Sequence, residues 1–156
     1  MKTRKSVSFF ILFLFLIGAL FLVSCTSEKN NEINGEKAII FKSSSCGCCG
    51  IFSRYMDDKG FNVEINDLPD LNGIKEKYAI PIELQSCHTT IVGDYFVEGH
   101  IPAEAIQKLL LEKPDIAGIA LPGMPSGSPG MPGPKQEKWM IYAVGHDGQV
   151  TDFMEI

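Results

Sequence analysis

Residues 38–56, AIIFKSSSCGCCGIFSRYM, decide the fold predicted for this chain. The segment begins with a short apolar run of β-forming residues, which indicates a buried strand. A loop with three cysteines follows, and apolar residues then recur at helical spacing from Ile51 to Met56 until Gly60, a typical helix stop. A strand that leads through a cysteine loop into a helix therefore opens the predicted domain.

Further elements are predicted between this unit and residue 113. They are a strand at 61–65, a short helix around 71–78, two strands at 89–92 and 95–97 joined by a Gly93-Asp94 turn, and a helix that begins at Pro102. The expected order is β-α-β-α-β-β-α. Because a helix joins the first two strands, they should be parallel. This order, with a cysteine loop before the first helix, resembles the thioredoxin fold.

From residue 114 onward, an extension of this domain is predicted. The segment 114–134 contains LPGMPSGSPGMPGP, with Gly or Pro at nearly every second position, so neither a helix nor a regular strand is expected there. Strands at 139–144 and 149–154, joined by a turn in which His146 should be solvated, form the expected closing β-hairpin. The low complexity of the loop fits a disordered linker, but structure on both sides favours a loop pinned to the domain.

Before residue 37, the chain shows the features of targeting. Residues 1–24 combine three basic residues with a long apolar run, the layout of a secretory signal peptide. Cys25 follows a sequence that resembles the lipobox of bacterial lipoproteins, which implies that Cys25 is lipidated and holds the protein at the periplasmic side of a bacterial membrane. An uncleaved membrane anchor is the alternative. Residues 25–36 are expected to form a flexible tether, and 37–156 one domain.

The charge balance excludes some classes of partner. Removal of residues 1–24, which contain three basic and no acidic residues, takes the formal net charge from −5 to −8. Such acidity argues against nucleic acid or anionic lipid as a partner and is compatible with metal cations.

The four cysteines of the predicted domain indicate its chemistry. Cys46, Cys48 and Cys49 lie at a predicted helix N-terminus, where unpaired N–H groups and the helix dipole favour thiolates. They are too close in sequence to join distant loops. In a thioredoxin-like fold, Cys87 and His88 would face them, with His88 where thioredoxins carry proline. Disulfide exchange needs only Cys46 and Cys49, so the additional ligands favour a metal.

The donor types select the metal. Thiolates and imidazole, with thioethers from Met124 and Met131 in the loop, favour Cu(I), and zinc is the main rival. Adjacent Cys48 and Cys49 do not easily converge on one small ion. We therefore infer a site with several Cu(I) ions bridged by thiolates, and a single bound ion is the simpler alternative.

The motifs CGCC (46–49), SCHT (86–89), VEGHIPAEAI (97–106) and GIALPGMPSGSPGM (118–131) resemble the CopG-type periplasmic copper-resistance proteins. The resemblance covers residues 38–156 and implies a thioredoxin-like domain with a C-terminal extension, copper at the cysteine motif and a redox role in copper detoxification. The metal-binding positions that it implies are Cys46, Cys48, Cys49, Cys87, His88, His100, Met124 and Met131.

Two functions from different classes follow. The first is an extracytoplasmic copper-binding protein that interconverts Cu(I) and Cu(II), with copper efflux or chaperone proteins as candidate partners. The second is a metal-free thiol–disulfide oxidoreductase that uses Cys46 and Cys49. Whether the protein is an enzyme, as a copper or thiol oxidoreductase, stays open between them.

Overall fold

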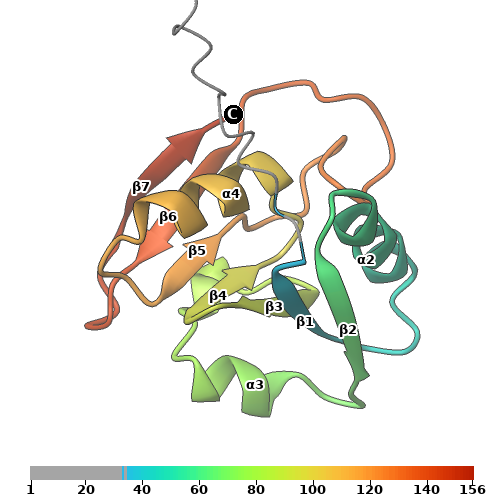
Figure 1. Cartoon of the computed structure of the whole chain (residues 1–156), viewed down its shortest axis with the longest axis horizontal. Helices are drawn as coiled ribbons and strands as arrows, with labels where there is room; N and C mark the ends of the chain where they lie inside the picture. Colours follow the sequence, from blue (N-terminus) through green and yellow to red (C-terminus); the bar gives the residue numbers. More distant parts are fainter. Residues whose placement is uncertain (1–32, 34) are drawn as a thin grey trace, which may run out of the picture. The chain divides into compact units, whose positions relative to one another are not determined.

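The structure is a computed structural model and describes residue 33 and residues 35–156. This part of the chain is built around one mixed β-sheet (Figure 1). Its seven strands follow the order β2-β1-β3-β4-β5-β6-β7. The strands are β1 (Lys37–Lys42), β2 (Asn62–Asp67), β3 (His88–Val92), β4 (Tyr95–Glu98), β5 (Gly118–Ala120), β6 (Met140–Val144) and β7 (Val150–Glu155). The helices are α2 (Gly47–Asp58), α3 (Asn72–Lys77), the short 3-10 helix η2 (Ile82–Leu84) and α4 (Ala103–Glu112).

The opening unit forms as its sequence predicts. In β1, the side chains of Ala38 and Ile40 are fully buried, as expected for a strand that lies inside a sheet. Helix α2 crosses the sheet and returns the chain to β2, which pairs with β1 in parallel. The helix ends at Asp58, and Gly60 follows with a φ of +91° that favours glycine.

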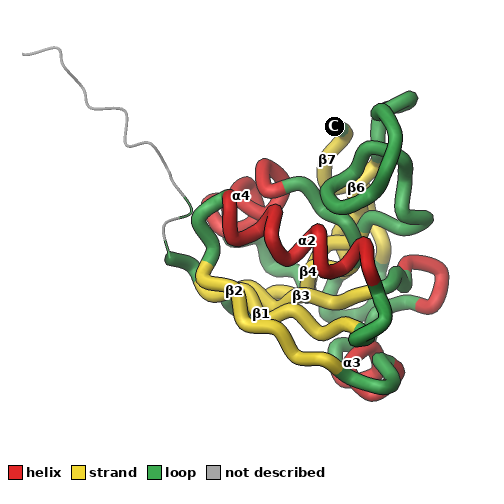
Figure 2. Tube along the Cα trace, turned by 90° about the vertical axis from the view of Figure 1, so that its right-hand side faces the viewer, coloured by secondary structure: helices red, strands yellow, loops and turns green. Residues whose placement is uncertain are grey.

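The helices cover both faces of the sheet. Helices α2 and α4 lie on one face and α3 lies on the other (Figure 2). Phe52 of α2 and Leu109 of α4 are fully buried in the larger hydrophobic core, on the first face. A smaller core around Leu84 and Phe96 fills the α3 side. The sheet therefore separates α2, with its cysteines, from α3.

One prediction about the extension is wrong. No regular strand was expected between residues 114 and 134, yet β5 forms there and pairs in parallel with β4 and antiparallel with β6. The strand has three residues, and its hydrogen bonds with β4 and β6 stabilise it on both sides. The predicted closing hairpin is confirmed, because β6 and β7 are antiparallel, with an irregularity at Ile141/Tyr142.

The Gly/Pro-rich loop is built from hydrogen-bonded turns. The N–H of Met131 donates to the carbonyl of Ser128 at 2.8 Å, and the N–H of Gly127 donates to that of Pro132 at 3.2 Å. Ser128 is buried. The carbonyl oxygen of Pro129 also accepts a hydrogen bond from Nδ1 of His100 at 2.6 Å, so the loop is pinned to the domain, as its place between structured segments suggested.

The predicted leader, Cys25 and most of the predicted tether lie outside the described residues. Within the described part of the chain, no helix is long and apolar enough to cross a membrane.

Candidate metal site

The first turn of α2 gathers three cysteines. Cys46 is the N-cap residue with an extended backbone, and Cys48 and Cys49 belong to the turn that follows. Cys46 and Cys49 are joined by a disulfide, and the sulfur of Cys48 lies 3.5 Å from that of Cys46. Cys48 and Cys87 are the free cysteines among the described residues. The motif is thus an oxidised C-x-x-C pair with a free thiol beside it.

Cys87, just before β3, joins these cysteines to two histidines. Its sulfur lies 4.0 Å from that of Cys48, 3.5 Å from Nδ1 of His88 and 3.0 Å from Nε2 of His100. There are two groups of residues, and within each group the potential ligand atoms all lie within 4.8 Å of one another. We call them the sulfur cluster (Cys46, Cys48, Cys49, Cys87) and the histidine cluster (Cys87, His88, His100). Cys87 belongs to both clusters, so a metal bound in one cluster would share a ligand with a metal in the other.

The orientation of His100 is fixed by the loop. Its Nδ1 donates to the carbonyl oxygen of Pro129 at 2.6 Å, and its Nε2 faces Cys87. Metal-binding histidines are commonly oriented by such a bond, which settles which nitrogen keeps the proton. The orientation of His100 is therefore one that would suit a metal ligand. The loop carbonyl that orients it carried no sequence signal, because every residue has a carbonyl group.

His88 is fully buried, and one of its two ring nitrogens lacks a hydrogen-bond partner in the described part of the chain. The ring packs on Phe52 at 4.4 Å and meets His100 edge-on at 4.8 Å, between centroids. Its Nε2 has no hydrogen-bond partner among the described residues. A buried polar atom left unpaired costs about 1–3 kcal/mol. A histidine that only filled the core would normally be paired, so this arrangement fits a ligand better.

Burial sets the protonation of the site. It raises the pKa of the Cys87 thiol to about 11, with a further contribution from the Cys48 thiol. Burial also holds the pKa of His88 well below its usual range, helped by His100 and Lys75. The pKa of His100 is lowered by burial as well. Both imidazoles are therefore neutral near pH 7, the form that binds metals, whereas Cys87 must give up a proton.

The Gly/Pro-rich loop lies against the cysteine turn. At Gly130, with a φ of +87°, a Cβ atom would come within 2.7 Å of the carbonyl oxygen of Cys48, so only glycine fits. Met131 follows this contact directly and is partly buried. Met124 lies in the same loop with 42% of its surface exposed. Thioether ligation by either residue stays a prediction.

Sequence reasoning missed a buried charged group beside the site. The carboxylate of Glu98 in β4 is fully buried and forms an ion pair with Lys75 of α3. It also accepts hydrogen bonds from the backbone N–H of Ser86 and the hydroxyl of Thr89, each at 2.6 Å. Charged residues are normally expected to be exposed, and a separation of 23 positions in the sequence hides the pairing.

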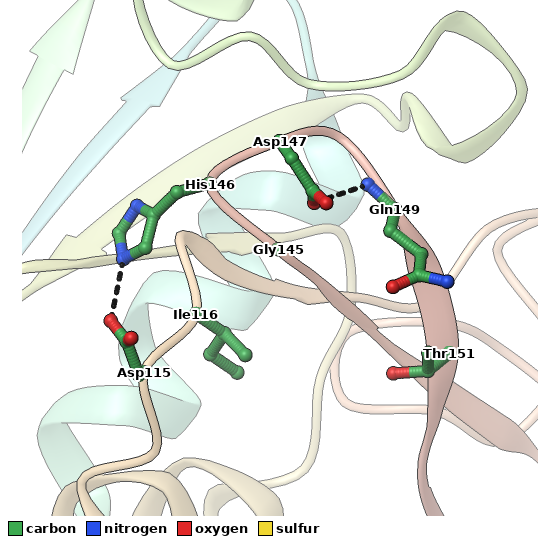
Figure 3. Close-up of a pocket in the computed structure, with 7 residues that line it drawn as sticks. All are labelled: Asp115, Ile116, Gly145, His146, Asp147, Gln149 and Thr151. Carbon is green, nitrogen blue, oxygen red and sulfur yellow. Dashed lines mark hydrogen bonds and ion pairs between the residues drawn. The ribbon is translucent and has the colours of Figure 1, made fainter.

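A second group of polar residues lines a cavity of about 380 Å³ near the closing hairpin (Figure 3). Nε2 of His146 lies 3.4 Å from a carboxylate oxygen of Asp115, and Asp147 accepts a hydrogen bond from the N–H of Gln149. The His146 side chain is 65% exposed and that of Asp115 fully exposed. The expectation that His146 is solvated is therefore confirmed.

The comparisons with known proteins found a matching family and two similar solved structures. Residues 84–131 match a family described as a protein of unknown function, DUF411. Two solved structures of a copper resistance protein CopG, form 2 and form 1, are each 34% identical to this chain with a TM-score of 0.73. Each comparison covers 79% of this chain and 99% or 98% of the solved chain. No curated protein matched. The chain thus combines similarity to copper resistance proteins with a cysteine cluster that could hold a metal ion.

Proposed function

The chain belongs to the family of CopG-type copper-resistance proteins, and on this premise we propose that it binds copper at the sulfur and histidine clusters. The observation that carries the proposal is the position of Cys87. Its sulfur is near Cys48 on one side and two neutral imidazoles on the other. Thiolate and imidazole together are soft to borderline donors and favour Cu(I), with zinc as the rival.

We further propose that the reduced protein holds more than one Cu(I) ion. Reduction of the disulfide would give four thiols within 4.8 Å, a density that suits sulfur atoms bridging neighbouring ions. Cys48 and Cys49 are adjacent in the chain, which makes convergence of all four sulfurs on one small ion difficult. The role of Cys48 in this proposal is that of a bridge.

The Cys46–Cys49 disulfide also supports a redox role. Oxidation of the two thiols to the disulfide releases two electrons and two protons. Two Cu(II) ions could accept those electrons and become two Cu(I) ions, so that atoms and charge balance. The reverse step, in which two Cu(I) ions would give two electrons to the disulfide and two protons would be taken up, would return Cu(II) and the two thiols. In this proposal, tight binding of several Cu(I) ions belongs to the reduced form of the protein.

The same disulfide favours a second candidate function, metal-free thiol–disulfide exchange by Cys46 and Cys49. A pair at a helix N-terminus is suited to this reaction, because the helix dipole stabilises the attacking thiolate. The thioredoxin-like architecture that we propose for the domain fits both functions. Its support is the β-α-β-α-β-β-α order up to α4 and the parallel β1–β2 pair.

We propose that the protein acts on the periplasmic side of a bacterial membrane, anchored through a lipid on Cys25, with copper efflux or chaperone proteins as partners. The support is the pattern of residues 1–25, and a disulfide is compatible with that compartment. Cys25→Ala should release the protein from membranes in cell fractionation. Continued membrane association of that variant would favour an uncleaved anchor instead.

The experiment that tests the copper proposal compares reduced and oxidised protein purified without oxygen. Copper and zinc per chain are measured by elemental analysis after Cu(I) titration against a competing chelator. We expect more than one tightly held Cu(I) per chain in the reduced form and fewer in the disulfide form. If neither form takes up Cu(I) and the protein reduces a disulfide substrate, the oxidoreductase function is the correct one.

A further inference from the structure

We propose that Glu98 is a positioning residue that sets the geometry of the histidine cluster from the opposite face of the sheet. This inference deepens the proposed function and rests on it for the identity of the metal. The group that carries it is the Glu98 clamp, defined here as the Glu98 carboxylate with its donors Ser86 and Thr89.

The clamp holds the chain on both sides of two ligands. One carboxylate oxygen accepts the N–H of Ser86, the residue before Cys87, at 2.6 Å. The other accepts the hydroxyl of Thr89, the residue after His88, also at 2.6 Å. One rigid group therefore fixes the backbone just before and just after the Cys87-His88 pair.

Glu98 is also close in sequence to His100, the third residue of the histidine cluster, with only Gly99 between them. The N–H of Gly99 donates to the carbonyl of His88 at 3.1 Å, and His100 follows. A Cβ atom on Gly99, where φ is +81°, would lie 2.7 Å from the carbonyl oxygen of Leu121 and 2.9 Å from Ser86. This close approach brings the segment of His100 against that of Cys87, and their ligand atoms end 3.0 Å apart.

Alternation along β3 separates the clamp from the ligands. His88 points towards α2, where it packs on Phe52. Thr89 points to the other face, towards Lys75 of α3, and Figure 2 shows α2 and α3 on opposite sides of the sheet. A change in the clamp therefore alters the ligand positions without removing a ligand.

The buried charge needs an explanation that stability alone does not give. Glu98 and Lys75 are almost completely buried, and such pairs are often no more stabilising than apolar residues of the same size. Both carboxylate oxygens of Glu98 accept hydrogen bonds, and two of the three donors, Ser86 and Thr89, flank the Cys87-His88 pair. Positioning of Cys87, His88 and His100 accounts for this placement.

The test uses two double variants that both remove the buried charges. Lys75→Met with Glu98→Gln keeps a carbonyl oxygen for Ser86 and a polar group for Thr89. Lys75→Met with Glu98→Leu has a similar volume and loses both hydrogen bonds. The matched surface control is Lys138→Met with Glu155→Leu, which removes an exposed ion pair of 2.7 Å.

The readouts are nitrogen chemical shifts of the histidines in metal-free protein, and Cu–N scattering and Cu(I) affinity in loaded protein. We expect the Gln variant and the surface control to match the wild type. The Leu variant should shift the His88 and His100 signals, lose Cu–N scattering and bind Cu(I) about 10- to 100-fold more weakly, as outer partners of metal ligands do when removed.

Wild-type signals in the Leu variant, or equal losses in the Gln and Leu variants, would overturn the positioning role. If the Leu variant does not fold, Thr89→Val replaces it, and unchanged histidine shifts in that variant would overturn the role equally. Because the shifts are measured without metal, they decide the role of Glu98 even if the wild type binds no copper.

Discussion

The histidine cluster and the His146 cavity contain similar chemical groups in opposite settings. His88 and His100 are fully buried, and both direct a nitrogen at the sulfur of Cys87. His146 is mostly exposed and meets one solvated carboxylate at 3.4 Å. The exposed His146 and Asp115 side chains of Figure 3 also interact with water, whereas the buried imidazoles of the histidine cluster contact protein groups.

The difference lies in convergence rather than in residue type. In the sulfur and histidine clusters, potential ligand atoms from the start of α2, the residue before β3, the start of β3 and the segment after β4 come together around Cys87, and a loop carbonyl orients one of them. In the cavity, Asp147 accepts a hydrogen bond within its own turn, and the Asp115 side chain that meets His146 is fully exposed. A metal centre is therefore expected at the first location and not at the second.

The largest effect is expected from Cys87→Ser, because Cys87 is shared by both clusters. Cu(I) affinity should fall by roughly 100-fold or more, beyond the effect of losing an outer partner of a ligand. His146→Gln is the control and should leave affinity unchanged in the same chelator competition. Equal Cu(I) affinities for the wild type and Cys87→Ser would contradict the proposed difference between the histidine cluster and the His146 cavity.

Cys48→Ser should lower the number of Cu(I) ions bound per reduced chain while leaving the Cys46–Cys49 pair able to form its disulfide. The reason is that Cys48 is the sulfur between that pair and Cys87. Elemental analysis measures the first quantity and thiol counting the second. An unchanged copper content would show that Cys48 is not a bridge.

The pH dependence of Cu(I) affinity follows from the buried thiol. The pKa of Cys87 is raised to about 11, so metal binding below that pH must release its proton. Affinity should therefore rise with pH by about tenfold per unit for each proton released. Competition with a chelator of known pH dependence measures the slope between pH 6 and 9 (roughly the range where carboxylates stay ionised). A flat profile would indicate that no thiol proton is displaced.

The smallest effect is expected from Met124→Leu combined with Met131→Leu. Thioethers are weak, neutral ligands, and Met124 is 42% exposed, so Cu(I) retention should fall by roughly threefold, under 1 kcal/mol. Leucine keeps the apolar volume, which separates ligation from packing. Chelator competition identical to that of the wild type would show that the two side chains only pack.

Local sequence patterns predicted most elements, because strands β1 to β4 and helices α2 to α4 each carry their own apolar periodicity. The short strand β5 was missed, since its three residues depend on β4 and β6 for their hydrogen bonds. Pro102 lies at the N-cap of α4, one position before the helix that it was expected to begin.

For the site, the sequence indicated the candidate ligands but not the contacts that hold them in place. The C-x-C-C spacing and the Cys87-His88 pair indicated a metal site from the sequence alone, and the structure brings them together with His100. The Pro129 carbonyl and the Glu98 clamp were not visible, because each depends on contacts between segments that are distant in sequence.

Anomalous diffraction at the copper edge from crystals of the reduced, Cu(I)-loaded protein would locate every bound copper ion. We expect more than one copper ion, with the sulfur of Cys87 bound to copper in both clusters, and no copper at His146. Copper at His146 with none at Cys87, or a single ion that leaves Cys48 or both imidazoles unbound, would contradict this expectation.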